Sequence, residues 1–171
     1  LNLVDSFSPK KLYVINVQAD QPFISKALIK NFIANINKMN HPELVTAYYK
    51  KEYNSFNDSQ DLVKLTTSSI SKRVLYFSRS IIPNINKFSL SKTKNSKHSF
   101  IKCHIGVYAY RFDILKSWNG LKKSQLEIYE SLEQLRWLDN DIPIYAFEHD
   151  KEVLSVDNIN ELEIAREEYK K

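Results

Sequence analysis

The sequence predicts an α/β fold built on a mixed β-sheet. Segments rich in β-branched and aromatic residues alternate along the chain with segments whose apolar residues recur at helical spacing, and this alternation is typical of the fold class. The chain has 171 residues, of which 43% are hydrophobic and 26% are charged, so it is long and apolar enough to bury one core. Because no internal repeat or linker divides it, we expect a single domain over residues 1–171.

The first two elements have the clearest patterns. Residues 12–17 begin with four apolar or aromatic residues in a row, which is typical of a strand that is covered on both faces. The apolar residues Ile24, Leu28, Phe32, Ile33 and Ile36 recur at helical spacing and predict an amphipathic helix over residues 25–39.

The rest of the chain is predicted to continue with strands and short helices. Further strands are expected over residues 43–50, 61–66, 73–78, 101–110 and 143–148, with a polar loop over residues 84–99 and a short helix over residues 112–118.

Two further helices begin with capping patterns. Ser124 and Glu127 form a capping box, which predicts a helix that continues to about residue 138. Asn158 followed by Glu161 resembles a second cap and opens a final helix. The apolar face of this last helix is expected to consist of Leu162, Ala165 and Tyr169.

Composition excludes several classes of protein. The single cysteine, Cys103, excludes a disulfide framework and a multi-cysteine zinc site within the chain, and it fits a cytoplasmic protein. Only two glycines occur, Gly106 and Gly120, so the chain has no glycine-rich phosphate loop. No uncharged apolar run approaches the roughly 18–20 residues of a membrane-spanning helix, and we expect no membrane partner.

The net charge of +5 indicates a weakly basic surface. Its densest basic stretch, residues 87–102, could be a nucleic-acid patch, a solvated loop or a loop beside an anionic small-molecule site. Because no RNA-recognition, zinc-finger or helix-turn-helix pattern accompanies it, the solvated loop is favoured and no nucleic-acid partner is expected.

Polar side chains follow the ends of predicted strands, where ligands bind in open α/β sheets. Gln18 and Asp20 come directly after the first strand, and Asp20 is either a Mg²⁺ ligand or a turn or capping residue before Pro22. Asp157 lies between a strand and a helix start, where a capping role is the commoner one.

Other candidate residues have plain structural alternatives. The guanidinium of Arg79 suits a carboxylate ligand or a surface ion pair. His104 and Tyr108 lie on one face of a predicted strand, where a lone histidine is more often a structural hydrogen-bonding residue. Glu133 and Gln134 lie in the middle of a predicted helix, and their position alone indicates no function.

Taken together, these segments resemble the 3-deoxy-manno-octulosonate cytidylyltransferases, the CMP-Kdo synthetase family. The matching segments keep the family's order and cover essentially the whole chain. They are VINVQADQPFI (14–24), VLYFSRSIIP (74–83), KCHIGVYAYR (102–111), LEIYESLEQLRWL (126–138) and VDNINELEIAR (156–166), with a looser match in FNDSQDLVK (56–64).

The resemblance implies an enzyme that transfers CMP from CTP to 3-deoxy-manno-octulosonate (Kdo) and releases pyrophosphate, a step of lipopolysaccharide biosynthesis. It implies a Rossmann-like, three-layer nucleotide-diphospho-sugar transferase fold and a homodimer formed through the central excursion, roughly residues 84–119. The residues that match the family's Mg²⁺ ligands, which would act in catalysis, are Asp20 and Asp157. Those that match its sugar-binding set are Gln18, Arg79, His104, Tyr108, Glu133 and Gln134.

The sequence also departs from the family pattern. The family's first strand, which lies beside the one matching residues 12–17, and its basic, glycine-containing triphosphate loop have no counterpart here. We therefore expect the chain to be a fragment of the full enzyme and to be inactive in isolation. Ala19, Gln21 and Ser155 replace a usual Gly, Glu and Gly. The alternatives are a cytidylyltransferase for a related acidic sugar, an amino-sugar variant or a nonulosonate, and a non-catalytic remnant that acts as a binding module.

Overall fold

A computed structural model of the chain describes residues 11–53, 59–84 and 99–170. Its elements are β1 (Tyr13–Val17), α1 (Lys26–Lys38), β2 (Leu44–Glu52), β3 (Lys64–Thr67), β4 (Val74–Ser78), β5 (Phe100–Arg111), α3 (Phe112–Lys116), the 3-10 helix η3 (Trp118–Gly120), α4 (Gln125–Glu130), α5 (Gln134–Asp139), β6 (Ile144–Glu148) and α6 (Ile159–Tyr169). This order confirms the predicted α/β class.

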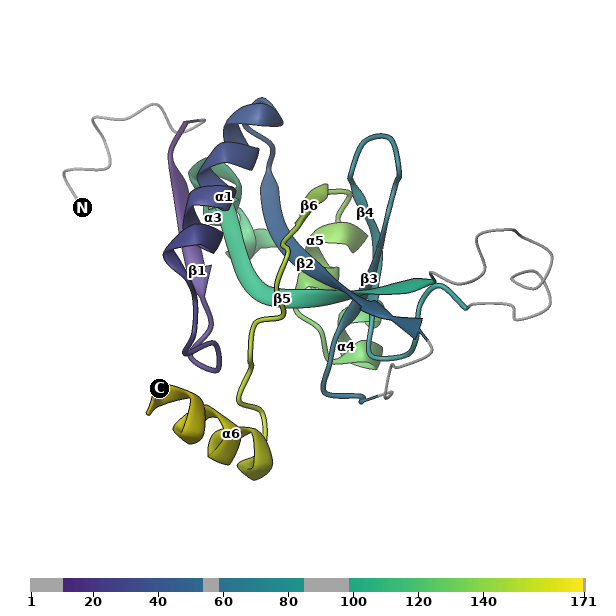
Figure 1. Cartoon of the computed structure of the whole chain (residues 1–171). Coiled ribbons are helices and arrows are strands. Elements are labelled where there is room, and N and C mark those ends of the chain that lie inside the picture. Colours follow the sequence, from purple (N-terminus) through teal and green to yellow (C-terminus); the bar gives the residue numbers. More distant parts are fainter. Residues whose placement is uncertain (1–10, 54–58, 85–98, 171) are drawn as a thin grey trace.

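The strands form one mixed sheet in the order β4-β3-β5-β2-β6, and β1 pairs with the far end of β5. The β2–β6 pair is parallel, and the other paired strands are antiparallel. The long strand β5 curves strongly across the molecule (Figure 1). Its register against β2 shifts in the middle, because Thr46 pairs with Tyr108 whereas Ala47 pairs with Ile105. Such an irregularity bends a strand, and β5 pairs with β1 near one end and with β3 nearer the other.

Helices cover both faces of the sheet, as expected for three layers. Ser25 caps α1 by accepting a hydrogen bond from the Leu28 N–H at 3.1 Å. On this face Phe32 meets Phe147 edge to face, with ring centroids 4.9 Å apart. A second core lies on the opposite face, where the buried side chains of Leu135 and other residues around α5 cover β2, β3, β4 and β6.

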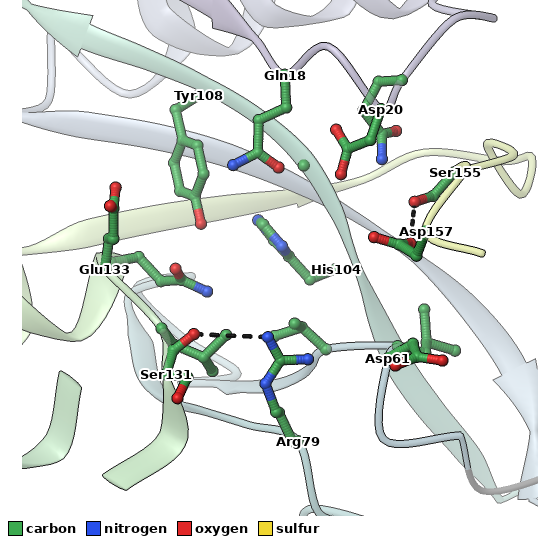
Figure 2. Close-up of a pocket in the computed structure, with 16 residues that line it drawn as sticks. Gln18, Asp20, Asp61, Arg79, His104, Tyr108, Ser131, Glu133, Ser155 and Asp157 are labelled. Carbon is green, nitrogen blue, oxygen red and sulfur yellow. Dashed lines mark hydrogen bonds between the residues drawn. The ribbon is translucent and has the colours of Figure 1, made fainter. Parts of the chain in front are cut away.

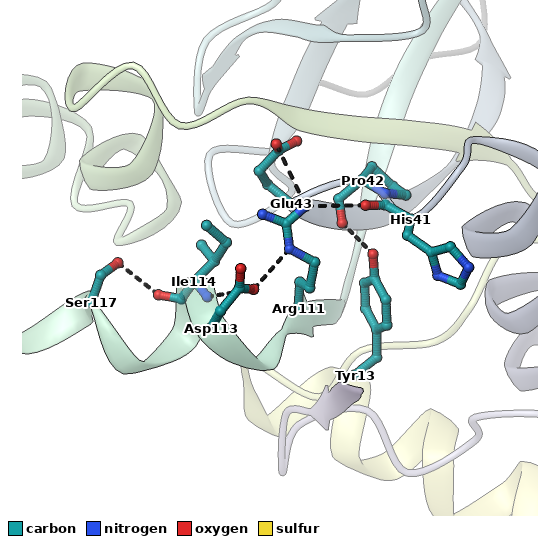
Figure 3. Close-up of polar contacts among 8 residues, drawn as sticks. All are labelled: Tyr13, His41, Pro42, Glu43, Arg111, Asp113, Ile114 and Ser117. Atoms are coloured by element: carbon teal, nitrogen blue, oxygen red, sulfur yellow. Dashed lines mark hydrogen bonds and ion pairs between the residues drawn. The ribbon is translucent and has the colours of Figure 1, made fainter. Parts of the chain in front are cut away.

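A polar network holds the start of β1 (Figure 3). The Arg111 guanidinium lies 2.7 Å from the Asp113 carboxylate and 3.7 Å from that of Glu43, and it donates a hydrogen bond to the His41 carbonyl at 3.1 Å. The Tyr13 hydroxyl donates to the carbonyl of Pro42 in the same loop. These contacts hold β1 against the α1–β2 loop. They therefore help to fix the position of Gln18 and Asp20, which follow the other end of β1.

The prediction that the first strand is covered on both faces was wrong for the described part of the chain. In that part, β1 pairs with β5 alone, and the side chains of Val14 and Val17 are 39% and 41% exposed. An apolar run indicates that a strand is suited to burial, but which neighbours cover it depends on the tertiary arrangement.

The single helix predicted from Ser124 to about residue 138 was also wrong. Ser124 does cap α4, but the helix ends at Ser131, whose backbone is left-handed with φ 53° and ψ 47°. A new helix, α5, begins three residues later. A left-handed serine is uncommon, and nothing in the residue pattern indicates it.

Three smaller predictions need correction or lie outside the described residues. β3 begins at Lys64 instead of residue 61, because the Ser59 hydroxyl accepts a hydrogen bond from the Asp61 N–H and forms a turn there. Tyr169 is 85% exposed, because the end of α6 projects away from the sheet (Figure 1). Most of the basic stretch, residues 87–98, lies outside the described residues, whereas Lys102 lies over the Tyr48 ring at 4.9 Å.

Within the described ranges, no helix is both long enough and apolar enough to cross a membrane.

Candidate functional site

A pocket of about 450 Å³ opens where β1, β4, β5 and the α4–α5 junction meet (Figure 2). All of the site residues expected from the sequence line it. They are Gln18, Asp20, Arg79, His104, Tyr108, Glu133, Gln134 and Asp157. The pocket therefore brings these eight residues together from five separate segments of the chain.

The two aspartates are brought together by a backbone contact. The Val156 N–H donates to the Asp20 carbonyl at 2.9 Å, so the segment before α6 lies against the turn after β1. Asn158 supplies the helix cap by accepting hydrogen bonds from the Asn160 and Glu161 N–H groups. The capping role that position alone favoured for Asp157 is therefore wrong, and its carboxylate lines the pocket.

The electrostatic surroundings of Asp20 favour a cation. Its Oδ1 atom is buried and has no hydrogen-bond partner among the described residues. Burial raises the pKa of Asp20 above its usual value, and the negative charge of Asp157 raises it further. The Ser155 hydroxyl donates to Asp157 Oδ2, which leaves Oδ1 of Asp157 available. A cation bound between the Asp20 and Asp157 carboxylates would reduce the electrostatic repulsion between them.

This donor set fits Mg²⁺. Magnesium commonly binds proteins through one or two carboxylates and takes its other ligands from water and substrate phosphates. The described residues bring together no group of three or more His, Cys, Asp or Glu side chains that could hold a metal. A metal at Asp20 and Asp157 would therefore leave several coordination positions for substrate.

Arg79 forms one wall of the pocket and is held by backbone carbonyls. Its Nε donates to Glu130 O at 3.0 Å, its Nη1 to Gln60 O at 2.9 Å and its Nη2 to Ser131 O at 3.5 Å. No carboxylate among the described residues forms an ion pair with it. Two of its five N–H groups remain for a ligand, so the guanidinium can still receive a carboxylate.

His104 lies beside Tyr108 on the inner face of β5, with ring centroids 5.1 Å apart. The Thr46 hydroxyl donates its only proton to the Val107 carbonyl at 2.9 Å, so at 2.8 Å from His104 Nε2 it must act as the acceptor. The proton of the neutral ring is therefore on Nε2. His104 Nδ1, which has no hydrogen-bond partner within the described ranges, can accept a hydrogen bond from a ligand hydroxyl.

The state of His104 gives a pH-dependent prediction. Burial lowers the pKa of His104 to about 3, whereas in the unfolded chain it titrates near 6.5. Between these values the unfolded state binds more protons, so the free energy of unfolding should decrease as the pH falls from about 6.5 towards 3. His104→Gln keeps a donor for Thr46 and should remove this contribution. Urea denaturation of the parent chain and of His104→Gln at pH 7 and pH 5 measures this contribution. If the free energy of unfolding fell by the same amount between the two pH values in both proteins, the prediction would be contradicted.

The helix break at Ser131 presents Glu133 and Gln134 to the pocket. Glu133 stands at the N-cap position of α5 and Gln134 is the first residue of that helix, so the prediction that both lie in the middle of a helix was wrong. The negative charge of Glu133 contributes to raising the pKa of Tyr108, after the larger effect of burial. The Tyr108 hydroxyl is buried without a partner among the described residues and remains a donor at neutral pH.

Several lining residues were not identified as site residues from the sequence. Gln21 and Ser155 line the pocket and had been noted only as departures from a family pattern. Gly106 lines it too, and the scarcity of glycine was the available signal. Asp61 lines the pocket from the loop before β3; it lies in the loosely matching segment 56–64, which was not used to assign site residues.

Comparison with known proteins places the chain in a family. A family model described as cytidylyltransferase matches residues 1–150. The chain is 36% identical to a 3-deoxy-manno-octulosonate cytidylyltransferase of Cytophaga hutchinsonii over 88% of its own length and 58% of the relative's. It is 38% identical to one of Thermodesulfovibrio yellowstonii over 89% of its own length and 58% of the relative's.

A solved structure agrees with these relatives. A CMP:2-keto-3-deoxy-manno-octonic acid synthetase complexed with CTP superimposes with a TM-score of 0.75 at 28% identity, covering 92% of this chain and 61% of that one. The chain thus spans about 60% of the length of the relatives that it matches. On this evidence the chain belongs to the cytidylyltransferase family.

Proposed function

We propose that this chain carries the sugar-binding and metal-binding part of a 3-deoxy-manno-octulosonate cytidylyltransferase. The proposed reaction transfers CMP: the anomeric hydroxyl of the sugar attacks the α-phosphorus of CTP, and the bond to the pyrophosphate oxygen breaks. The observation that carries the proposal is the convergence of all eight expected residues in one pocket. The names of the relatives support the choice of CTP and of the sugar.

The pocket offers a complementary group for each part of an acidic sugar. The Arg79 guanidinium, with two N–H groups available, would receive the sugar carboxylate. His104 Nδ1 would accept a hydrogen bond from a hydroxyl, and the Tyr108 hydroxyl would donate one. Gln18, Glu133 and Gln134 would bind the remaining hydroxyls. Together these contacts would hold the sugar in one orientation, which is a large part of catalysis in phosphoryl transfer.

Asp20 and Asp157 are the residues proposed to hold Mg²⁺. When bound there, the ion would neutralise the negative charge that develops on the α-phosphate and on the attacking oxygen. The unpartnered Asp20 oxygen and the raised Asp20 pKa support this role, because both indicate a carboxylate that lacks a positive partner.

Three finer predictions accompany this function. We propose a homodimer formed through residues 84–119, of which residues 85–98 lie outside the described ranges. A place in lipopolysaccharide biosynthesis and a cytoplasmic location follow from the proposed substrate and stay predictions.

Pyrophosphate release tests the proposal. We define the chimera as residues 1–171 joined to the part of the Cytophaga hutchinsonii relative that the chain does not cover. The chimera should release pyrophosphate from CTP only when 3-deoxy-manno-octulosonate and Mg²⁺ are both present. The 171-residue chain alone should release none above background, because its two glycines cannot form a phosphate-binding loop.

The outcomes separate the alternatives. Turnover with an amino-sugar analogue or a nonulosonate, and none with 3-deoxy-manno-octulosonate, would change the sugar but keep the reaction. A folded chimera that binds CTP but releases no pyrophosphate with any of these sugars would support a non-catalytic binding module. Clear turnover by the 171-residue chain would show that it binds the triphosphate by other means.

A further inference from the structure

The antiparallel ladder between β1 and β5 places the glycine of β5 opposite a pocket residue. Val17 pairs with Val107, so the next two positions along the ladder, Gln18 and Gly106, face one another just beyond the end of β1. Gly106 also lies within the register shift of β5 against β2. The Gln18 carboxamide crosses this position and points into the pocket between Tyr108 and Asp20 (Figure 2).

A side chain at position 106 would occupy the space that Gln18 uses. A Cβ atom built on Gly106 would lie 2.5 Å from Gln18 Oε1 and 3.4 Å from Gln18 Cδ. It would lie 3.3 Å from Nε2 of Gln21, a buried residue. No glycine in the described ranges has a positive φ, so the backbone at Gly106 is one that alanine can adopt. What this position requires is space.

We infer that Gly106 is a positioning residue for sugar recognition and that it acts through Gln18. With hydrogen alone at position 106, the Gln18 carboxamide can lie against Gly106 with its oxygen towards that position while it lines the pocket. A methyl group there displaces the carboxamide, because the terminal amide of Gln18 can rotate away at lower cost than the backbone of a paired strand can move. The inference that sugar affinity depends on this contact rests on the proposed function.

The position of Gln18 can be measured without any ligand. In a ¹⁵N-labelled chain, the side-chain NH₂ signals of Gln18 are identified by their loss in Gln18→Ala. Gly106→Ala should shift these signals. Gly120→Ala is the matched control and should leave these signals in place, because within the described residues no atom beyond the chain neighbours of Gly120 lies within 4 Å of a Cβ built there.

Folding of the variants also tests the inference. Gln18→Ala/Gly106→Ala removes the group that the new methyl would meet, so it should fold even where Gly106→Ala does not. Unchanged Gln18 signals in folded Gly106→Ala would overturn the inference. Failure of both the single and the double variant to fold would also overturn it, because Gly106 would then be needed by the backbone.

Calorimetric titration with 3-deoxy-manno-octulosonate and Mg²⁺ tests the consequence for binding. Gly106→Ala and Gln18→Ala should each raise the Kd roughly 3- to 10-fold, as expected for one neutral hydrogen bond. The double variant should match Gln18→Ala alone. A double variant whose Kd rises by the product of both effects would show that Gly106 acts independently of Gln18. If the unchanged chain binds no sugar, the proposed function fails for this chain, and the NMR signals still decide the role of Gly106.

Discussion

Replacing Asp20 or Asp157 with alanine is expected to lower kcat for pyrophosphate release in the chimera by at least about 10³-fold. Loss of a single preorganised electrostatic contact in a transition state costs roughly 3–4 kcal/mol, or about 10²- to 10³-fold in rate, and loss of a ligand of the metal itself is expected to reach at least the upper end of this range. Each of these carboxylates is proposed to hold the same Mg²⁺. Asp20 has a buried oxygen without a partner among the described residues, so its alanine variant loses a metal ligand without breaking a hydrogen bond of that atom.

Asp61→Ala is the matched control for these variants. Asp61 is a carboxylate of the same pocket, but it is exposed and approaches from the loop before β3. Its variant should keep kcat within a few-fold of the parent value. Near-normal kcat in Asp20→Ala or Asp157→Ala would remove that residue from the metal site, and an equal loss in Asp61→Ala would indicate a general effect of pocket charge.

Arg79→Lys is expected to raise the KM for the sugar roughly 30- to 150-fold, which corresponds to about 2–3 kcal/mol for hydrogen bonds to a charged group. Lysine keeps the positive charge, but it cannot form the three backbone contacts and still offer two parallel N–H groups. The Glu130 and Ser131 carbonyls would also lose their donor, so the junction that presents Glu133 would be held less firmly.

The charge of the sugar separates these two effects. Against the methyl ester of the sugar, which lacks the carboxylate charge, Arg79→Lys and the parent should differ by only a few-fold. An equally large rise in KM for the ester would show that Arg79 acts on the pocket structure and does not bind the carboxylate. Arg73→Lys is the control, because Arg73 is exposed just before β4 and outside the pocket.

Residue patterns predicted the elements in which one face shows a regular spacing of side chains along the sequence. The helical spacing of apolar residues from Ile24 to Ile36 predicted α1 to within one residue at either end, because Leu28, Phe32 and Ile36 are buried. Ile33, which belonged to the same predicted face, is 53% exposed. The period of two along a strand placed His104 and Tyr108 on the same face of β5, and both line the pocket. Burial on one face is a property that the sequence itself displays.

Features that depend on distant contacts could not be predicted from residue patterns. Asp20 and Asp157 meet where Val156 donates a hydrogen bond to the Asp20 carbonyl, a contact between segments far apart in the chain. The left-handed backbone of Ser131 breaks a continuous helical pattern and turns Glu133 towards the pocket. Only the resemblance to a family indicated that these residues belong to one site. Asp61 was missed, although it lies in the loosely matching segment 56–64.

The position of the metal tests the central claim most directly. Crystals of the chimera grown with CTP and Mn²⁺, without sugar, would locate the ion from its anomalous scattering. We expect a peak within coordination distance of both the Asp20 and the Asp157 carboxylates, and we expect it to be lost in Asp20→Ala. A well-occupied peak held by CTP phosphates but away from one or both carboxylates would contradict the metal site on which the proposed reaction depends.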